Sequence, residues 1–87
     1  MRSEIRFIGR VQGVGFRATA KHLATDLGVN GWVRNEADGS VHLVVEGDES
    51  TVKKFLDEMH RRLQDHISDE QQTTGPATGR YSGFEIR

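Results

Sequence analysis

The sequence predicts an α+β fold in which one antiparallel sheet carries two helices on a single face. Apolar residues alternate with polar ones in three separate stretches, which is typical of half-buried strands. In two other stretches they recur at intervals of three and four residues, which indicates amphipathic helices. The stretches follow one another as strand, helix, strand, strand, helix, strand, with a short strand at the end.

The first strand is predicted over Glu4–Val11, where apolar and charged residues alternate. A helix is predicted over Arg17–Leu27, and Gly28 follows it at the position where glycine commonly ends a helix. The apolar positions that support these elements are Ile5, Phe7 and Val11 in the strand, and Phe16, Ala20, Leu23, Ala24 and Leu27 near or in the helix.

The next two strands form a predicted hairpin. They cover Gly31–Asn35 and Ser40–Glu46, and the residues Glu36–Gly39 between them contain Asp38-Gly39, a strong hairpin signal. A second helix follows Asp48, which can cap its N-terminus. Its apolar stripe consists of Val52, Phe55, Leu56, Met59 and Leu63.

The stretch from Gln64 to Gly83 contains few large apolar residues. We predict a weak edge strand over His66–Thr73, because edge strands tolerate polar side chains; disorder of this stretch is the alternative. Phe84–Arg87 alternates again and predicts a short closing strand. The whole order is that of a ferredoxin-like split βαβ (βαββαβ) sandwich with an added C-terminal strand.

Composition narrows the possible functions. The 87 residues fit one small domain, residues 1–87, and the absence of cysteine excludes disulfides and thiolate metal sites. A net charge of −1 argues against a nucleic-acid partner. No apolar stretch has membrane-spanning length, and the N-terminus lacks the apolar region of a signal peptide. We therefore expect a cytoplasmic monomer without membrane partners.

A glycine-rich loop, Gln12–Phe16, joins the first strand to the first helix. Gly13 and Gly15 permit positive φ, so that successive backbone N–H groups can point into one concavity. The helix N-terminus adds unpaired N–H groups, and Arg17 adds a planar fork of donors. These features predict an anion site, although a tight turn followed by a surface arginine explains the glycines equally well.

Asn35 ends the second strand just before the hairpin turn. An asparagine at this place commonly satisfies turn amides, which is the simpler interpretation. In the predicted sheet, however, the first and second strands end at the same edge, so Asn35 approaches the glycine loop. Its amide could then hold a water molecule opposite a bound phosphate.

The motifs GRVQGVGFR (Gly9–Arg17) and GWVRNEADGSV (Gly31–Val41) resemble those of the acylphosphatase family. The resemblance extends from Ile5 to the closing GFEIR (Gly83–Arg87). It implies hydrolysis of small-molecule acyl phosphates to a carboxylate and inorganic phosphate, with no metal and no cofactor. It also implies that Arg17 holds the phosphoryl group and Asn35 orients the attacking water. The loop N–H groups that complete the site are those of Gln12, Gly13, Val14, Gly15 and Phe16.

Some positions depart from the family pattern or carry no predicted role. Glu70, Gln71 and Gln72 are more polar than the family's edge strand usually is. His42 stands where an acidic residue is common, and we interpret it as an exposed strand position. Trp32 is interpreted as a packing residue. The other histidines, which we expect to bind no metal, are His22, His60 and His66.

The main alternative function is a non-catalytic module that binds phosphate or carbamoyl phosphate, because fold alone does not determine chemistry. An RNA-binding domain of the same fold is disfavoured, since the third strand (SVHLVVE) lacks aromatic residues for base stacking. The presence of both Arg17 and Asn35 favours catalysis.

Overall fold

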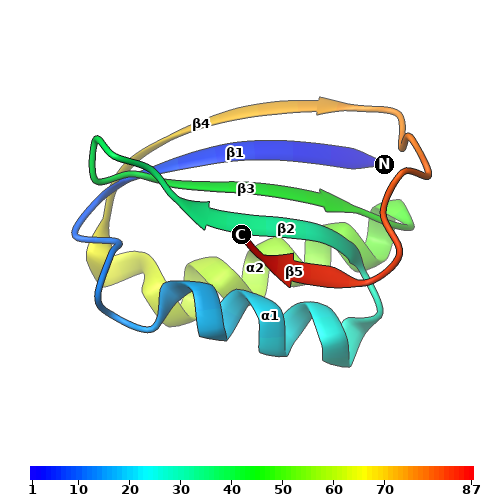
Figure 1. Ribbon diagram of the computed structural model, residues 1–87. Coiled ribbons are helices and arrows are strands. Elements are labelled where there is room, and N and C mark those ends of the chain that lie inside the picture. Colours follow the sequence, from blue (N-terminus) through cyan, green and yellow to red (C-terminus); the bar gives the residue numbers. More distant parts are fainter.

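A computed structural model describes all residues, 1–87, as two layers in which both helices cover one face of a five-stranded sheet (Figure 1). This confirms the ferredoxin-like prediction. A single 3₁₀ turn, Gln64–His66, joins the second helix to the fourth strand. The elements are β1 (Arg2–Gly9), α1 (Phe16–Leu27), β2 (Asn30–Asn35), β3 (Val41–Glu46), α2 (Glu49–Leu63), β4 (Ile67–Gly75) and β5 (Phe84–Ile86).

The strands lie in the order β4-β1-β3-β2-β5. The strands β1, β2, β3 and β4 pair antiparallel as predicted, whereas β5 runs parallel to β2, so the complete sheet is mixed. Because β1 and β2 both run antiparallel to β3, they run parallel to each other. Their C-terminal ends therefore meet at one edge of the sheet, together with the loop that enters α1 (Figure 1).

The core lies between the sheet and the two helices. It contains the predicted apolar stripe of α2 and the inward positions of β1 and β3. Phe16 is buried against Phe7, with ring centroids 4.9 Å apart, and this contact fixes the first turn of α1 on the sheet. The largest fully buried side chains are Phe7, Phe16, Phe55, Ile5, Leu43, Met59, Val11, Val33, Val41, Val44, Val45 and Val52.

Two predicted details at element ends are wrong. The first strand ends at Gly9 rather than at Val11, because its ladder with β4 becomes irregular between Ile8 and Gly9. Val11 is buried, but it lies in the following loop. Asp48 occupies the N-cap position of α2, yet its side chain makes no capping hydrogen bond. The other predicted boundaries either coincide with the observed ones or differ from them by one or two residues.

The polar stretch after α2 does form the edge strand β4, so the alternative of disorder is wrong. Its residues are mostly exposed, and it pairs along the whole of β1. Backbone hydrogen bonds to a long central neighbour do not depend on apolar side chains. The strand therefore forms despite its composition.

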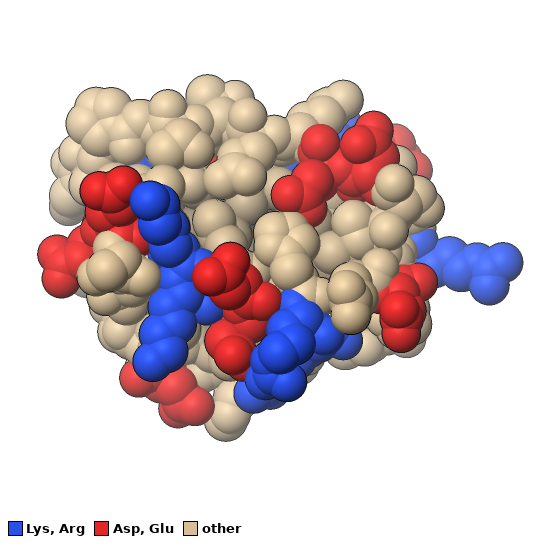
Figure 2. All heavy atoms as spheres, turned by 180° about the vertical axis from the view of Figure 1, so that it is seen from behind, with Lys and Arg blue, Asp and Glu red and all other residues tan.

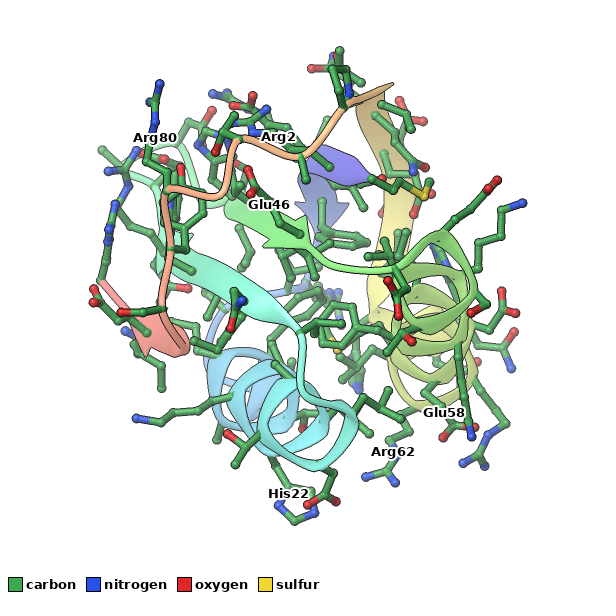
Figure 3. All side chains as sticks on the ribbon, turned by 90° about the vertical axis from the view of Figure 1, so that its right-hand side faces the viewer. Arg2, His22, Glu46, Glu58, Arg62 and Arg80 are labelled. Atoms are coloured by element: carbon green, nitrogen blue, oxygen red, sulfur yellow. The ribbon has the colours of Figure 1, made fainter.

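The connection between β4 and β5 is anchored by a buried carboxylate. Glu46 is only 4% exposed and accepts hydrogen bonds from the Thr78 N–H (3.0 Å), the Thr78 hydroxyl (2.6 Å) and the Gly79 N–H (3.0 Å). Arg2 Nε lies 3.5 Å from the same carboxylate, and Figure 3 shows Glu46 and Arg2 next to this connection. Burial raises the pKa of Glu46, but the three hydrogen bonds outweigh it and hold the pKa below its usual value.

The sheet face opposite the helices carries a polar network with one aromatic residue at its centre. Trp32 is buried as predicted, with the guanidinium groups of Arg34 and Arg87 4.9 and 5.2 Å from its ring centroid. His42 is not the exposed residue that we expected. It lies half-buried between Glu4 (2.7 Å) and Glu36 (3.2 Å), because the register of three strands brings both carboxylates to it.

The surface carries charges of both signs. On the face behind that of Figure 1, groups of lysine and arginine side chains alternate with aspartate and glutamate (Figure 2). Neither helix is long and apolar enough to cross a membrane.

Candidate active site

A pocket of about 240 Å³ lies at the sheet edge where β1 and β2 end. One wall comes from the glycine loop and the first turn of α1, and the other from β2 and β5. The residues that line it are Val11, Gly13, Gly15, Phe16, Arg17, Ala18, Asn35 and Ile86.

The glycine loop lines the pocket with Gly13 and Gly15 and has backbone N–H groups without a protein partner. Gly13 and Gly15 have φ values of +79° and +77°, which L-residues with a side chain rarely adopt. The N–H groups of residues 12–15 donate to no backbone carbonyl of the chain. The loop therefore offers donors to a ligand instead of using them within the fold.

The start of α1 adds to this donor set. Gly15 is the N-cap and provides no side-chain hydrogen bond, so the N–H groups of the first turn have no partner from a cap. The helix dipole places partial positive charge at the same point. Arg17, in this first turn, is exposed and has no carboxylate within ion-pair distance. Together these groups suit a small multivalent anion.

Asn35 enters the pocket from the last position of β2. Its Oδ1 is buried and accepts no hydrogen bond from the protein. A buried polar atom without a partner costs stability and is rare in folded proteins, so the Asn35 amide next to this pocket has a hydrogen-bond acceptor that the protein itself does not use. The Asn35 Oδ1 therefore accepts no hydrogen bond from a turn amide, in contrast to the simpler interpretation of this residue.

The acidic residues of the hairpin turn, Glu36 and Asp38, form no ion pair with Arg17. A hydrogen bond from Arg34 lowers the pKa of Glu36, and hydrogen bonds from Ser40 lower the pKa of Asp38. Asp38 also pairs with Arg6 at 3.0 Å. Each carboxylate thus has its own partner, and Arg17 stays available.

The structure brings together most of the residues that the motifs predicted. Gly13, Gly15, Phe16, Arg17 and Asn35 line the pocket, although the Phe16 ring itself points into the core. Val14 lies between the two lining glycines and is 37% exposed. Gln12 does not line the pocket, and its side chain bonds to the hairpin turn.

Three lining residues were missed by the sequence reasoning: Val11, Ala18 and Ile86. Val11 lies within the GRVQGVGFR motif and Ala18 follows it directly, so their positions in the sequence could have indicated the first two. Ile86 had no such signal, because it reaches the pocket only through the parallel pairing of β5 with β2.

Comparisons with known proteins agree with this geometry. The acylphosphatase family model matches residues 3–86. An acylphosphatase of Rhizobium etli is 42% identical over 81 residues, which cover 93% of this chain and 72% of the relative.

Solved structures give the same result. The crystal structure of acylphosphatase from Bacillus subtilis has a TM-score of 0.87 and 28% identity, and the match covers 99% of this chain and 97% of that one. Full-length HypF in its phosphate- and nucleotide-bound form has a TM-score of 0.81 and 26% identity. That match covers 99% of this chain but 11% of HypF, so there the fold is a small part of a larger protein. The chain therefore belongs to the acylphosphatase family of hydrolases.

Proposed function

We propose that this chain hydrolyses acyl phosphates to a carboxylate and inorganic phosphate, with Arg17 and Asn35 as its catalytic residues. One observation carries the proposal. A single pocket combines free backbone N–H groups, an unpaired arginine and an asparagine whose Oδ1 has no partner.

The phosphoryl group is held by the loop and by Arg17. The N–H groups of Gln12–Phe16 and the guanidinium donate to its non-bridging oxygens, on which negative charge is distributed in the transition state. A planar fork can bind two of these oxygens at once. Because the donors are preorganised by the fold, little reorganisation is needed during the reaction.

The attacking water is held by Asn35. The side-chain Oδ1 accepts a hydrogen bond from the water and orients its oxygen towards phosphorus. As the new oxygen–phosphorus bond forms, the bond between phosphorus and the bridging acyl oxygen breaks, and its electron pair leaves with the carboxylate. The protons of the water pass to phosphate and solvent. A carboxylate is a good leaving group, so this route requires neither a general acid nor a metal.

Steady-state hydrolysis of benzoyl phosphate tests the proposal. We expect turnover that is unaffected by EDTA and competitively inhibited by inorganic phosphate. Asn35→Ala should lower kcat strongly and leave the inhibition constant of phosphate unchanged, because orientation of the water contributes to the rate and not to phosphate affinity. If phosphate raises the unfolding temperature of the wild type but no substrate is hydrolysed, the chain is a binding module and the proposal is wrong.

A further inference from the structure

The Gln12 side chain joins the glycine loop to the turn that follows Asn35. Its Nε2 donates to the backbone carbonyl of Glu36 at 2.8 Å and to that of Ser40 at 3.0 Å. Both partners are carbonyl oxygens, so the amide nitrogen and not the amide oxygen must face them. These bonds connect residues that are 24 and 28 positions apart in the sequence.

The same two carbonyls close the hairpin turn. The Glu36 N–H donates to the Ser40 carbonyl at 2.9 Å, and the Gly39 N–H donates to the Glu36 carbonyl at 3.1 Å. Asp38 adds a further bond, since its Oδ1 accepts from the Ser40 hydroxyl at 2.6 Å. The turn is therefore closed by its own groups, and Gln12 is an additional link rather than the element that forms the turn.

The link lies between the two halves of the candidate active site. Gln12 precedes the pocket-lining Gly13, and Glu36 follows the pocket-lining Asn35. The proposed phosphate cradle, which consists of the backbone N–H groups of Gln12–Phe16, lies in the loop. The Asn35 amide lies at the end of β2, the strand that enters the turn. Elsewhere in this region no other side chain bonds the loop to the turn.

We propose that Gln12 is a positioning residue: its side chain sets the separation between the phosphate cradle and the Asn35 amide. This inference rests on the proposed function. The contact of Gln12 with substrate, through its backbone N–H, is unaffected by the nature of its side chain. Removal of the side-chain amide should leave the cradle able to bind phosphate while the water is held out of line, and a misplacement of about 1 Å can cost about 100-fold in rate.

The central experiment replaces Gln12 by methionine, which has a similar length and no N–H donor. We expect kcat for benzoyl phosphate to fall on the order of 10- to 100-fold, with the phosphate inhibition constant unchanged. Gln72→Met is the matched control. It also removes a glutamine Nε2 donor, which here bonds to the Ser3 Oγ at 3.3 Å between β1 and β4. This control should keep the wild-type kcat.

A double-mutant cycle with Asn35→Ala distinguishes positioning from a general structural effect. If Gln12 acts through Asn35, Gln12→Met should have almost no further effect on kcat in the Asn35→Ala background. Effects that multiply would show that the two residues act independently and would overturn the proposal. Wild-type kcat in Gln12→Met would overturn it as well.

Rescue by a second variant completes the test. Gln12→Lys keeps an N–H donor that can reach the two carbonyls, so it should recover most of the kcat that methionine loses. If Gln12→Met is unfolded at the assay temperature, or loses phosphate inhibition, Gln12 is a structural residue and the inference is wrong. If the wild type fails to turn over, the proposed function fails first, and the two failures are thereby distinguished.

Discussion

At the scale of single residues, the glycines of the GRVQGVGFR motif serve two different purposes. A Cβ on Gly9 would lie 2.5 Å from the His66 carbonyl oxygen and 2.7 Å from the Ser68 nitrogen, so the close approach of β4 requires glycine there. A Cβ on Gly15 would meet nothing within 4 Å, and only its φ of +77° favours glycine. Glycine is therefore needed at position 9 for the packing of the sheet, whereas at position 15 it allows the backbone conformation of the pocket loop.

This difference predicts unequal effects of two alanine substitutions. Gly15→Ala should cost about 1–2 kcal/mol of folding free energy, the strain of a left-handed conformation. Gly9→Ala should cost more, because a backbone clash is added to the strain. Chemical denaturation of the two variants measures the difference, and equal losses would contradict the assignment of Gly9 to packing.

A second prediction for single residues concerns the kinetic effect of substituting Arg17. Arg17→Ala should reduce kcat/KM for benzoyl phosphate by about 10²–10³, which is typical for the loss of a transition-state donor. Arg17→Lys should recover little, since a point charge cannot form a two-pronged contact. Arg80→Ala is the control, because Arg80 is also exposed but lies in the connection between β4 and β5 and points away from the fold (Figure 3). Wild-type kinetics in both Arg17 variants would exclude the role of Arg17.

At the scale of elements, β4 and β1 are stabilised by different interactions. β1 lies between two strands and buries Ile5 and Phe7 completely, whereas β4 has one neighbour and mostly exposed side chains. We expect amide hydrogen exchange to be fastest in β4 among the four long strands. Equal protection of β4 and β1 would show that the edge strand is held by more than its ladder.

The connection that follows β4 should be held chiefly by Glu46. Glu46→Gln removes the negative charge that three donors share, and hydrogen bonds to a charged group contribute roughly 1.5–3 kcal/mol. We therefore expect a clear fall in the free energy of unfolding at neutral pH. Glu85→Gln, at an exposed position of β5, is the control and should leave stability nearly unchanged. If both variants are equally stable, the buried carboxylate does not anchor the connection.

At the scale of the whole molecule, the paired carboxylates predict how stability depends on pH. A hydrogen bond from His42 lowers the pKa of Glu4, and one from Arg34 lowers the pKa of Glu36. Arg61 does the same for Glu58. The pKa of Glu46 is lowered by the hydrogen bonds described above. A carboxylate with a lowered folded-state pKa stabilises the fold above its unfolded pKa, and this contribution is lost as the pH falls through the folded value. The free energy of unfolding should thus be constant near neutral pH and fall below about pH 4.5. In Glu46→Gln this acid-dependent fall should be smaller, and an identical fall would contradict the lowered pKa of Glu46.

Local sequence was sufficient to predict the helices and strands, and also the residues on both sides of the candidate active site. Each element was predicted from a short stretch of sequence, because the signals depend only on near neighbours in the chain. These signals are the spacing of apolar residues in α1 and α2, Gly28 at the end of a helix, and Asp38-Gly39 in the hairpin. The order of these stretches then placed Asn35 opposite the glycine loop. The fold and the pocket-lining motif residues follow from this reasoning.

Contacts between distant residues were decided only by the tertiary structure. The partners of His42, the place of Ile86 in the pocket and the bonds of Gln12 to the hairpin turn all depend on strand register and on which strand β5 joins. The same holds for Glu46, whose partners Thr78 and Gly79 lie 32 and 33 residues away. Periodicity predicts which face of a strand is buried, but it does not identify the residue that a side chain meets across the sheet. That pairing is set by the packing of the whole chain.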